Sequence, residues 1–284
     1  MPENAIWVAL VFGAVVLGYT LIHRSTPARR RPAVDSLVMR LGLPVDEHII
    51  ALIDRRVRST VIGSCVAGFI ALAVAAVLLV AGGGLPEGLA STLLGLVFAA
   101  AVSLGTAAGG AGYFAPQAAQ SVRIARAQTP RLNDYLHPLW RWASIGVTVA
   151  AVLLCGAILA GAGATSGLIG VPMTGVVVAT ALAIAAQFGA SLLGRRLLDV
   201  PQPAREELEL QWDDALRGMT VRSLWIAAFT IAWAAALLAL LWLLAATPTV
   251  TVWFGFVALV PILLLSVPAS RRVERRMWTD VVSA

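Results

Sequence analysis

Hydrophobic and polar positions follow one another along this chain in long blocks. The longest block without any Asp, Glu, Lys, Arg or His runs from Trp142 to Gly194. One bilayer crossing takes about 20 residues, so a block of this length is suited to two crossings and a turn. Small and turn-forming residues from Gly161 to Gly167 mark the turn near its middle. The block therefore predicts a membrane hairpin, with Arg141 and Arg195 at its two ends.

Three other parts of the chain have a related layout. Residues 59–122 carry a single charge, Glu87, within a Gly- and Pro-containing turn, and residues 223–270 carry none. The apolar run 5–22 is long enough for one crossing and is followed, not preceded, by arginines, which is typical of an uncleaved anchor. Together these blocks predict an all-α, polytopic integral membrane protein with seven transmembrane helices, an anchor plus three helical hairpins.

The arginines predict the orientation of the chain. All 21 basic residues are Arg, and all of them lie in the polar segments that follow the first, third, fifth and seventh crossings. The opposite side carries only Glu3 and Glu87 as charged side chains. Because cytoplasmic segments are enriched in positive charge, we expect the N-terminus outside and the C-terminus in the cytoplasm. The predicted segments are a transmembrane anchor (1–22), an Arg-rich cytoplasmic segment (23–58), a hairpin (59–122), a cytoplasmic segment (123–141), a hairpin (142–194), an acidic cytoplasmic connector (195–222), a hairpin (223–270) and a basic tail (271–284).

The first cytoplasmic segment predicts a short amphipathic helix over residues 45–57. Pro27 and Pro32 favour an irregular start to the segment, and Pro44 favours a helix start. Asp54 and Arg58 are spaced to form an ion pair on the polar face. The helix would lie along the membrane surface or against its neighbours. Its apolar face consists of Val45, Ile49, Leu52, Ile53 and Val57.

The connector 195–222 differs from the other cytoplasmic segments because it holds six of the fifteen acidic residues. We expect a second amphipathic helix over 204–219, with Leu208, Trp212, Ala215, Leu216 and Met219 on one face. Glu206, Asp213 and Arg217 would lie on the opposite side, with Asp213 and Arg217 paired. An anionic membrane surface would not attract such a helix. It would therefore dock either on the Arg-rich segments of its own chain, which we favour, or on a partner protein. The candidate partner-binding residues are Glu206, Glu209, Trp212 and Asp213.

Composition excludes several classes of function. The chain is 59% hydrophobic and only 13% charged, whereas soluble domains carry about 25% charged residues. The cations are spread over short segments between apolar runs, so we expect no nucleic-acid partner. The lack of Lys excludes Schiff-base enzymes and phosphate-loop lysines. Cys65 and Cys155 each lie inside an apolar run, which argues against a disulfide framework.

The predicted crossings contain no ionisable side chain, although functional membrane sites often need one. We therefore predict no catalytic residue, metal or cofactor. Gln187 is the most notable polar residue at membrane depth. An interhelical hydrogen bond is its favoured role, and lining a substrate path is the alternative. Gly105 and Gly109 form a GxxxG pair, which permits close helix packing but is common by chance in such a chain.

Two functions are compatible with these features. The first is a non-catalytic, multi-pass membrane subunit of a transport or export assembly, with its cytoplasmic helices presented to a partner subunit. The second is a self-sufficient small-molecule channel or uniporter, lined by hydroxyl groups and Gln187. For either function we expect the chain in a cell membrane, the inner membrane of a bacterium, in contact with lipid.

Overall fold

The computed structural model describes residues 3–81, 87–114, 132–161, 173–200 and 207–244, and every regular element in these ranges is an α-helix. The predicted all-α class is thereby confirmed. The helices are α1 (Glu3–His23), α2 (Pro27–Leu41), α3 (Glu47–Ala81), α4 (Glu87–Phe114), α5 (Leu132–Tyr135), α6 (Pro138–Leu159), α7 (Met173–Asp199) and α8 (Glu207–Leu243).

Five of these helices, α3, α4, α6, α7 and α8, contain stretches long and apolar enough to cross a bilayer. In α1 the described apolar stretch is shorter, Leu10–His23. The central predicted hairpin corresponds to α6 and α7, which are consecutive long helices in contact. The protein is thus a helical membrane protein. The second limb of the last predicted hairpin, within 250–270, lies outside the described residues, so the predicted number of seven crossings stays a prediction.

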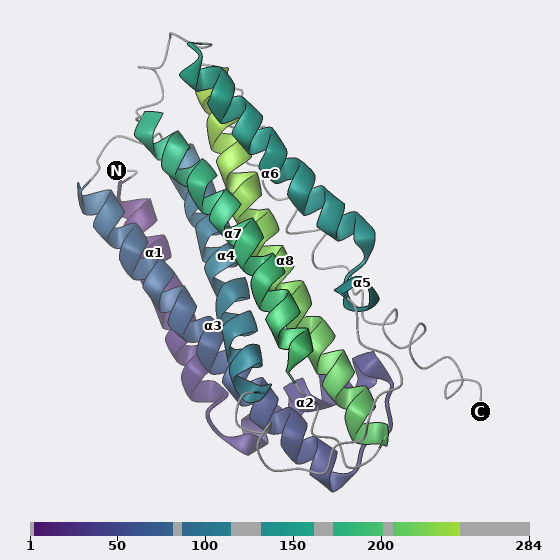
Figure 1. Cartoon of the computed structure of the whole chain (residues 1–284). Helices are drawn as coiled ribbons and strands as arrows, with labels where there is room; N and C mark the ends of the chain where they lie inside the picture. The colour runs from purple at the N-terminus through teal and green to yellow at the C-terminus, as the bar shows by residue number, and fades with distance from the viewer. Residues whose placement is uncertain (1–2, 82–86, 115–131, 162–172, 201–206, 245–284) are drawn as a thin grey trace.

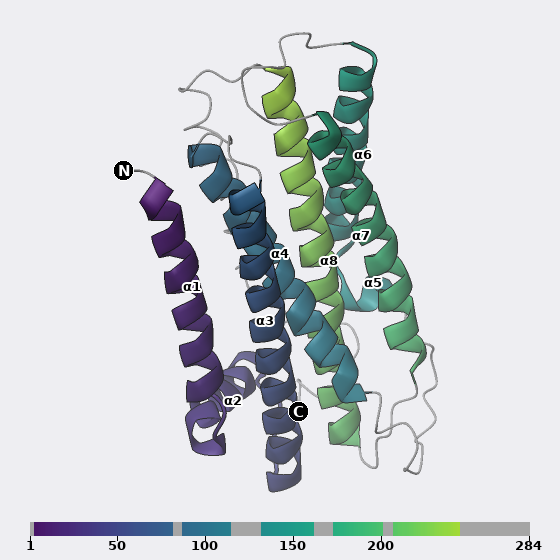
Figure 2. The same ribbon diagram turned by 90° about the vertical axis from the view of Figure 1, so that its left-hand side faces the viewer.

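Helix α8 forms the centre of the bundle. It packs against α4, α6 and α7 (Figures 1 and 2). Helix α3 contacts α4, and α1 lies outermost against α3. Small residues let the neighbours approach α8 closely along its length. Its fully or almost fully buried alanines are Ala227, Ala228, Ala232, Ala235 and Ala239.

Helices α3 and α8 are longer than a bilayer crossing requires. They contain 35 and 37 residues, which corresponds to about 52 and 55 Å. The hydrocarbon layer is only about 30 Å thick. Both helices therefore extend well beyond it, and α2 packs beside this extension of α3 at the same end of the bundle (Figure 1). We call this end the polar head, made of α2, residues 47–58 of α3 and residues 207–222 of α8.

The two amphipathic helices predicted from the sequence are not separate elements of the structure. Residues 45–57 and 204–219 were expected as separate short helices, but residues 47–57 and 207–219 form the first turns of α3 and α8. The physical reason is that neither helix has a proline between these turns and its apolar span. Each helix therefore continues unbroken from the head into the bundle.

The predicted irregular start of the first polar segment was also wrong, because α2 occupies most of it. Pro27 takes a first helical position, where a missing N–H has no cost. Pro32 lies inside the helix, where its missing N–H removes one intrahelical hydrogen bond without ending the helix. The helix ends at Gly42, whose φ of 70° is a left-handed conformation that glycine adopts readily. The Gly42 N–H donates to the Val38 carbonyl at 2.8 Å.

Glycines bring α3 and α4 into direct backbone contact. A Cβ atom at Gly105 would overlap the carbonyl group of Gly63, and one at Gly109 would overlap the carbonyl group of Ser59. The Ser59 hydroxyl donates to the Gly109 carbonyl at 2.6 Å. The GxxxG pair in α4 is therefore a packing motif, a role that the sequence alone could not distinguish from chance.

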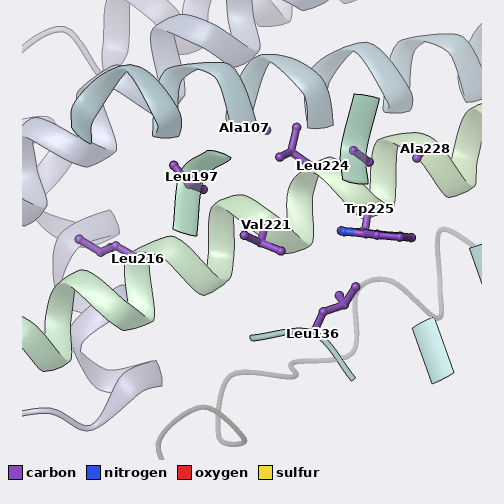
Figure 3. Close-up of a cluster of buried hydrophobic side chains, with 9 residues drawn as sticks. Ala107, Leu136, Leu197, Leu216, Val221, Leu224, Trp225 and Ala228 are labelled. Atoms are coloured by element: carbon purple, nitrogen blue, oxygen red, sulfur yellow. The ribbon is translucent and has the colours of Figure 1, made fainter. Parts of the chain in front are cut away.

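A cluster of buried hydrophobic side chains packs between the head and the rest of the bundle. Leu216, Val221, Leu224 and Trp225 of α8 meet residues from α4, α7 and the chain just before α6 (Figure 3). The other buried members are Ala107, Leu136, Ala190, Leu197 and Ala228. Because one cluster includes residues of both the head and the apolar spans, the two parts share a continuous core.

Candidate functional site

Three arginines of the polar head are buried, the only buried arginines in the described part of the chain. They are Arg30 of α2, Arg56 of α3 and Arg217 of α8, with side chains 3%, 4% and 1% exposed. Each guanidinium group donates to backbone carbonyls in the last turns of another helix or directly after it. The C-terminal turns of a helix carry partial negative charge. A buried cation at this position therefore stabilises the helix end.

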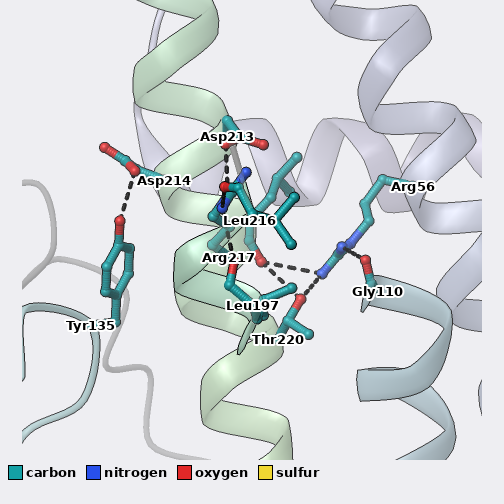
Figure 4. A network of polar contacts seen from close by, with 10 residues as sticks. Arg56, Gly110, Tyr135, Leu197, Asp213, Asp214, Leu216, Arg217 and Thr220 are labelled. Carbon is teal, nitrogen blue, oxygen red and sulfur yellow. Dashed lines mark hydrogen bonds and ion pairs between the residues drawn. The ribbon is translucent and has the colours of Figure 1, made fainter. Parts of the chain in front are cut away.

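Arg56 connects α3 to the end of α4 and to α8. One of its terminal nitrogens donates to the carbonyl of Gly110, within the last turns of α4 (Figure 4). The other donates to the Thr220 hydroxyl and, at 3.1 Å, to the Leu216 carbonyl. The helices α3, α4 and α8 thus meet at one guanidinium group.

Arg217 connects α8 to the end of α7 in a similar way. Its Nη1 donates to the carbonyls of Leu197 at 2.8 Å and Val200 at 2.6 Å, at the point where α7 ends (Figure 4). Its Nε donates to Asp213 Oδ2 at 2.8 Å, which confirms the predicted ion pair. Its predicted place on a polar helix face was wrong, because the first turns of α8 are buried on nearly every side.

Arg30 holds the end of α1. Its Nε and Nη2 atoms donate to the two carboxylate oxygens of Asp54, each at 2.7 Å. Its Nη1 donates to the carbonyls of Arg24 at 3.0 Å and Ser25 at 2.6 Å, directly after α1. The hydrogen bonds that Arg30 donates to Asp54 raise the pKa of its guanidinium group, so this side chain stays charged. The predicted Asp54–Arg58 pair was wrong, because Arg30 occupies both oxygens of Asp54.

A buried carboxylate attaches the short helix α5 to the head. Asp214 of α8 is fully buried and accepts a hydrogen bond of 2.8 Å from the Tyr135 hydroxyl (Figure 4). A buried charge is tolerated only where polar groups surround it. The Tyr135 hydroxyl supplies one of them.

Three of the four predicted partner-binding residues lie in the described part of the chain, and all three contact other residues of this chain. Trp212 is 2% exposed, packs on α2 and α3, and donates from Nε1 to the Pro44 carbonyl at 2.8 Å. Glu209 lies 3.1 Å from His48 Nε2, and Asp213 pairs with Arg217. Glu206 lies outside the described residues. The structure therefore packs the described part of the acidic helix against its own chain, and a role in binding a partner stays a prediction.

Gln187 forms the predicted interhelical hydrogen bond. The Ser144 hydroxyl of α6 donates to Gln187 Oε1 of α7 at 2.8 Å. The Nε2 atom of Gln187 is buried and finds no partner among the described residues. Its alternative role, lining a substrate path, stays a prediction.

The sequence interpretation missed Arg30, Arg56, Asp214 and Tyr135. Arg56 had a signal, because it follows Ile49 and Ile53 at helical spacing on the apolar face of α3. The other three depend on contacts between segments distant in sequence, for which no local pattern exists.

In the part of the chain that the structure describes, no three His, Cys, Asp or Glu side chains are grouped to hold a metal ion. The buried arginines bind backbone carbonyls and carboxylates of the same chain. Comparisons with protein-family models, curated proteins and solved structures found no match for this chain.

Proposed function

We propose that the chain is a non-catalytic membrane subunit of a transport or export assembly, and that its polar head presents a cytoplasmic surface to a partner subunit. The observation that carries this proposal is the continuity of α3 and α8 from the bundle into the head. A head built on spanning helices keeps a fixed position relative to the membrane. That is what a docking platform needs.

The buried arginines support the same role. They hold the ends of α1, α4 and α7 against the head. Side chains on the outside of the head remain for a partner. Met39 of α2 is 77% exposed, and Glu207 in the first turn of α8 is also exposed. These two residues form the described part of the proposed partner surface.

The alternative function, a self-sufficient channel or uniporter lined by hydroxyls and Gln187, has less support. The centre of the bundle is filled by α8, most of whose span is buried within the chain. The hydroxyl groups of Thr148, Thr180 and Thr230 donate to carbonyls of their own helices. A polar path between the helices would need such groups turned toward it.

Purification from native membranes in mild detergent, followed by reconstitution, distinguishes the two functions. The proposed function predicts that the chain elutes with stoichiometric amounts of at least one other subunit, an ATPase or a second membrane protein. It also predicts that the chain alone passes no small solute in proteoliposomes. A homo-oligomer without other subunits that conducts solutes would replace the proposal with the channel.

A further inference from the structure

Helix α3 carries a continuous stripe of exposed residues that runs from the polar head into the apolar span. Arg55 and Arg58 begin the stripe, and Ile62, Val66 and Ile70 follow. Residues three and four apart share one face of a helix. The three apolar side chains are 42%, 49% and 59% exposed, which is high for branched hydrophobic residues outside a lipid environment.

The guanidinium groups of these two arginines have no hydrogen-bond or ion-pair partner among the described residues. Their neighbour Arg56 points inward to Gly110 and Thr220, whereas Arg55 and Arg58 are exposed. Asp54, the nearest acid on the same helix, is held through both oxygens by Arg30. Across the described ranges, neither Arg55 nor Arg58 makes a hydrogen bond or an ion pair.

The two arginines lie on α3 directly before its charge-free run, where a membrane boundary is expected. Arg58 is the last charged residue before the charge-free run that starts at Ser59. A guanidinium group binds phosphate oxygens in a bidentate manner and is weakly hydrated, so it suits the membrane boundary. The apolar residues that follow would lie beside an acyl chain.

We propose that this stripe binds one anionic diacyl phospholipid, with its headgroup phosphate between Arg55 and Arg58 and an acyl chain along Ile62, Val66 and Ile70. Charge complementarity selects an anionic lipid over a zwitterionic one. The apolar side chains of the stripe favour a lipid over a soluble anion, because a soluble anion has no acyl chain to contact them. The site is independent of the proposed subunit role, because it needs no partner protein.

The test uses the full-length protein purified in detergent, with dioleoyl phosphatidylglycerol and dioleoyl phosphatidylcholine as probes and native mass spectrometry as the readout. The wild type should retain the anionic lipid in preference to the zwitterionic one. Each arginine at a membrane surface contributes about 1 kcal/mol, so the Arg55→Gln/Arg58→Gln variant should bind the anionic lipid about 30-fold more weakly.

A matched control is Arg29→Gln/Arg40→Gln, which removes two exposed arginines at the same end of the bundle from α2, a helix without an apolar span. This variant should bind the anionic lipid like the wild type. Equal retention of both lipids by the wild type, or equal loss in the two double variants, would overturn the proposal. Equal thermal stabilisation by inorganic phosphate and by phosphatidylglycerol would also overturn it. Unchanged melting temperatures of both variants without lipid would show that the fold is intact.

Discussion

At the scale of single residues, the three buried arginines are the most informative feature of this protein. Each places a full positive charge against carbonyls at a helix C-terminus, where the backbone dipoles leave partial negative charge. Arg30, Arg56 and Arg217 do this for α1, α4 and α7. Buried charges normally destabilise a fold unless polar groups surround them. Here the helix ends and the charges satisfy each other.

Replacement of Arg56 by Met should therefore destabilise the protein strongly. The change leaves the carbonyls of Gly110 and Leu216 buried without this donor, and we expect a loss of about 2–4 kcal/mol in the free energy of unfolding. Thermal unfolding in detergent without added lipid measures the effect as a lower melting temperature. Arg55→Met is the matched control, because Arg55 is exposed and its replacement should change stability by less than about 0.5 kcal/mol. Equal melting temperatures for the two variants would refute the capping role.

The residue scale also shows how far sequence reasoning reaches. The Asp213–Arg217 pair and the polar contact of Gln187 were predictable, since each follows from local spacing or from one polar group at membrane depth. Arg30 was not, because its partner Asp54 lies on another helix. The incorrect Asp54–Arg58 pair followed from the same limit. The spacing rule for ion pairs within a helix identifies a possible partner, but it cannot show that an arginine from another helix binds the same carboxylate.

At the scale of helices, the closest contact is the one between α3 and α4. Gly63, Gly105 and Gly109 allow the two backbones to touch. Such contact lets many weak dispersion interactions form along the helix pair, which is a main source of association in lipid. A chance occurrence of GxxxG would leave the glycines facing open space, as Gly95 does on the same helix.

Gly105→Ala should consequently destabilise the α3–α4 pair, because the new methyl group overlaps the backbone of Gly63. Overpacking of this kind costs about 1–3 kcal/mol. Gly95→Ala is the same substitution on the same helix with no atom within 4 Å, and it should leave stability unchanged or slightly higher. Thermal unfolding of the two variants side by side provides the measurement. A Gly105→Ala protein as stable as Gly95→Ala would contradict the packing.

The hydrophobic pattern predicted where helices span the membrane but not where those helices begin. Apolar blocks between arginines predicted where the five described candidate spans lie, because a bilayer imposes that pattern directly. The continuity of α3 and α8 was missed because a switch from amphipathic to fully apolar pattern was interpreted as a boundary. A helix needs no boundary there unless a proline or a turn interrupts it.

At the scale of the whole molecule, charge is distributed unevenly. The exposed arginines that the structure describes lie on α2, near the end of α1, on the first turns of α3 or at the end of α7, all at the polar head (Figure 2). A bundle with this asymmetry should insert with the head in the cytoplasm.

Cysteine labelling of intact cells tests that orientation. Cys65 and Cys155 are buried and would be replaced by Ala in the background chain. A single cysteine at Met39, in the head, should react with a membrane-impermeant maleimide only after the cells are opened. A single cysteine at Leu244, 55% exposed at the other end of α8, should react in intact cells. The opposite result at both positions would reverse the predicted topology.

If the polar head is a fixed surface for a partner subunit, photo-crosslinking in living cells should trap that partner. A benzophenone amino acid would replace Met39 on α2 or Glu207 on α8, both exposed positions of the head. After irradiation, we expect an adduct of one defined mass that contains this chain and a second protein. Irradiated cells that yield only the free chain, or only dimers of the chain, at both positions would contradict it.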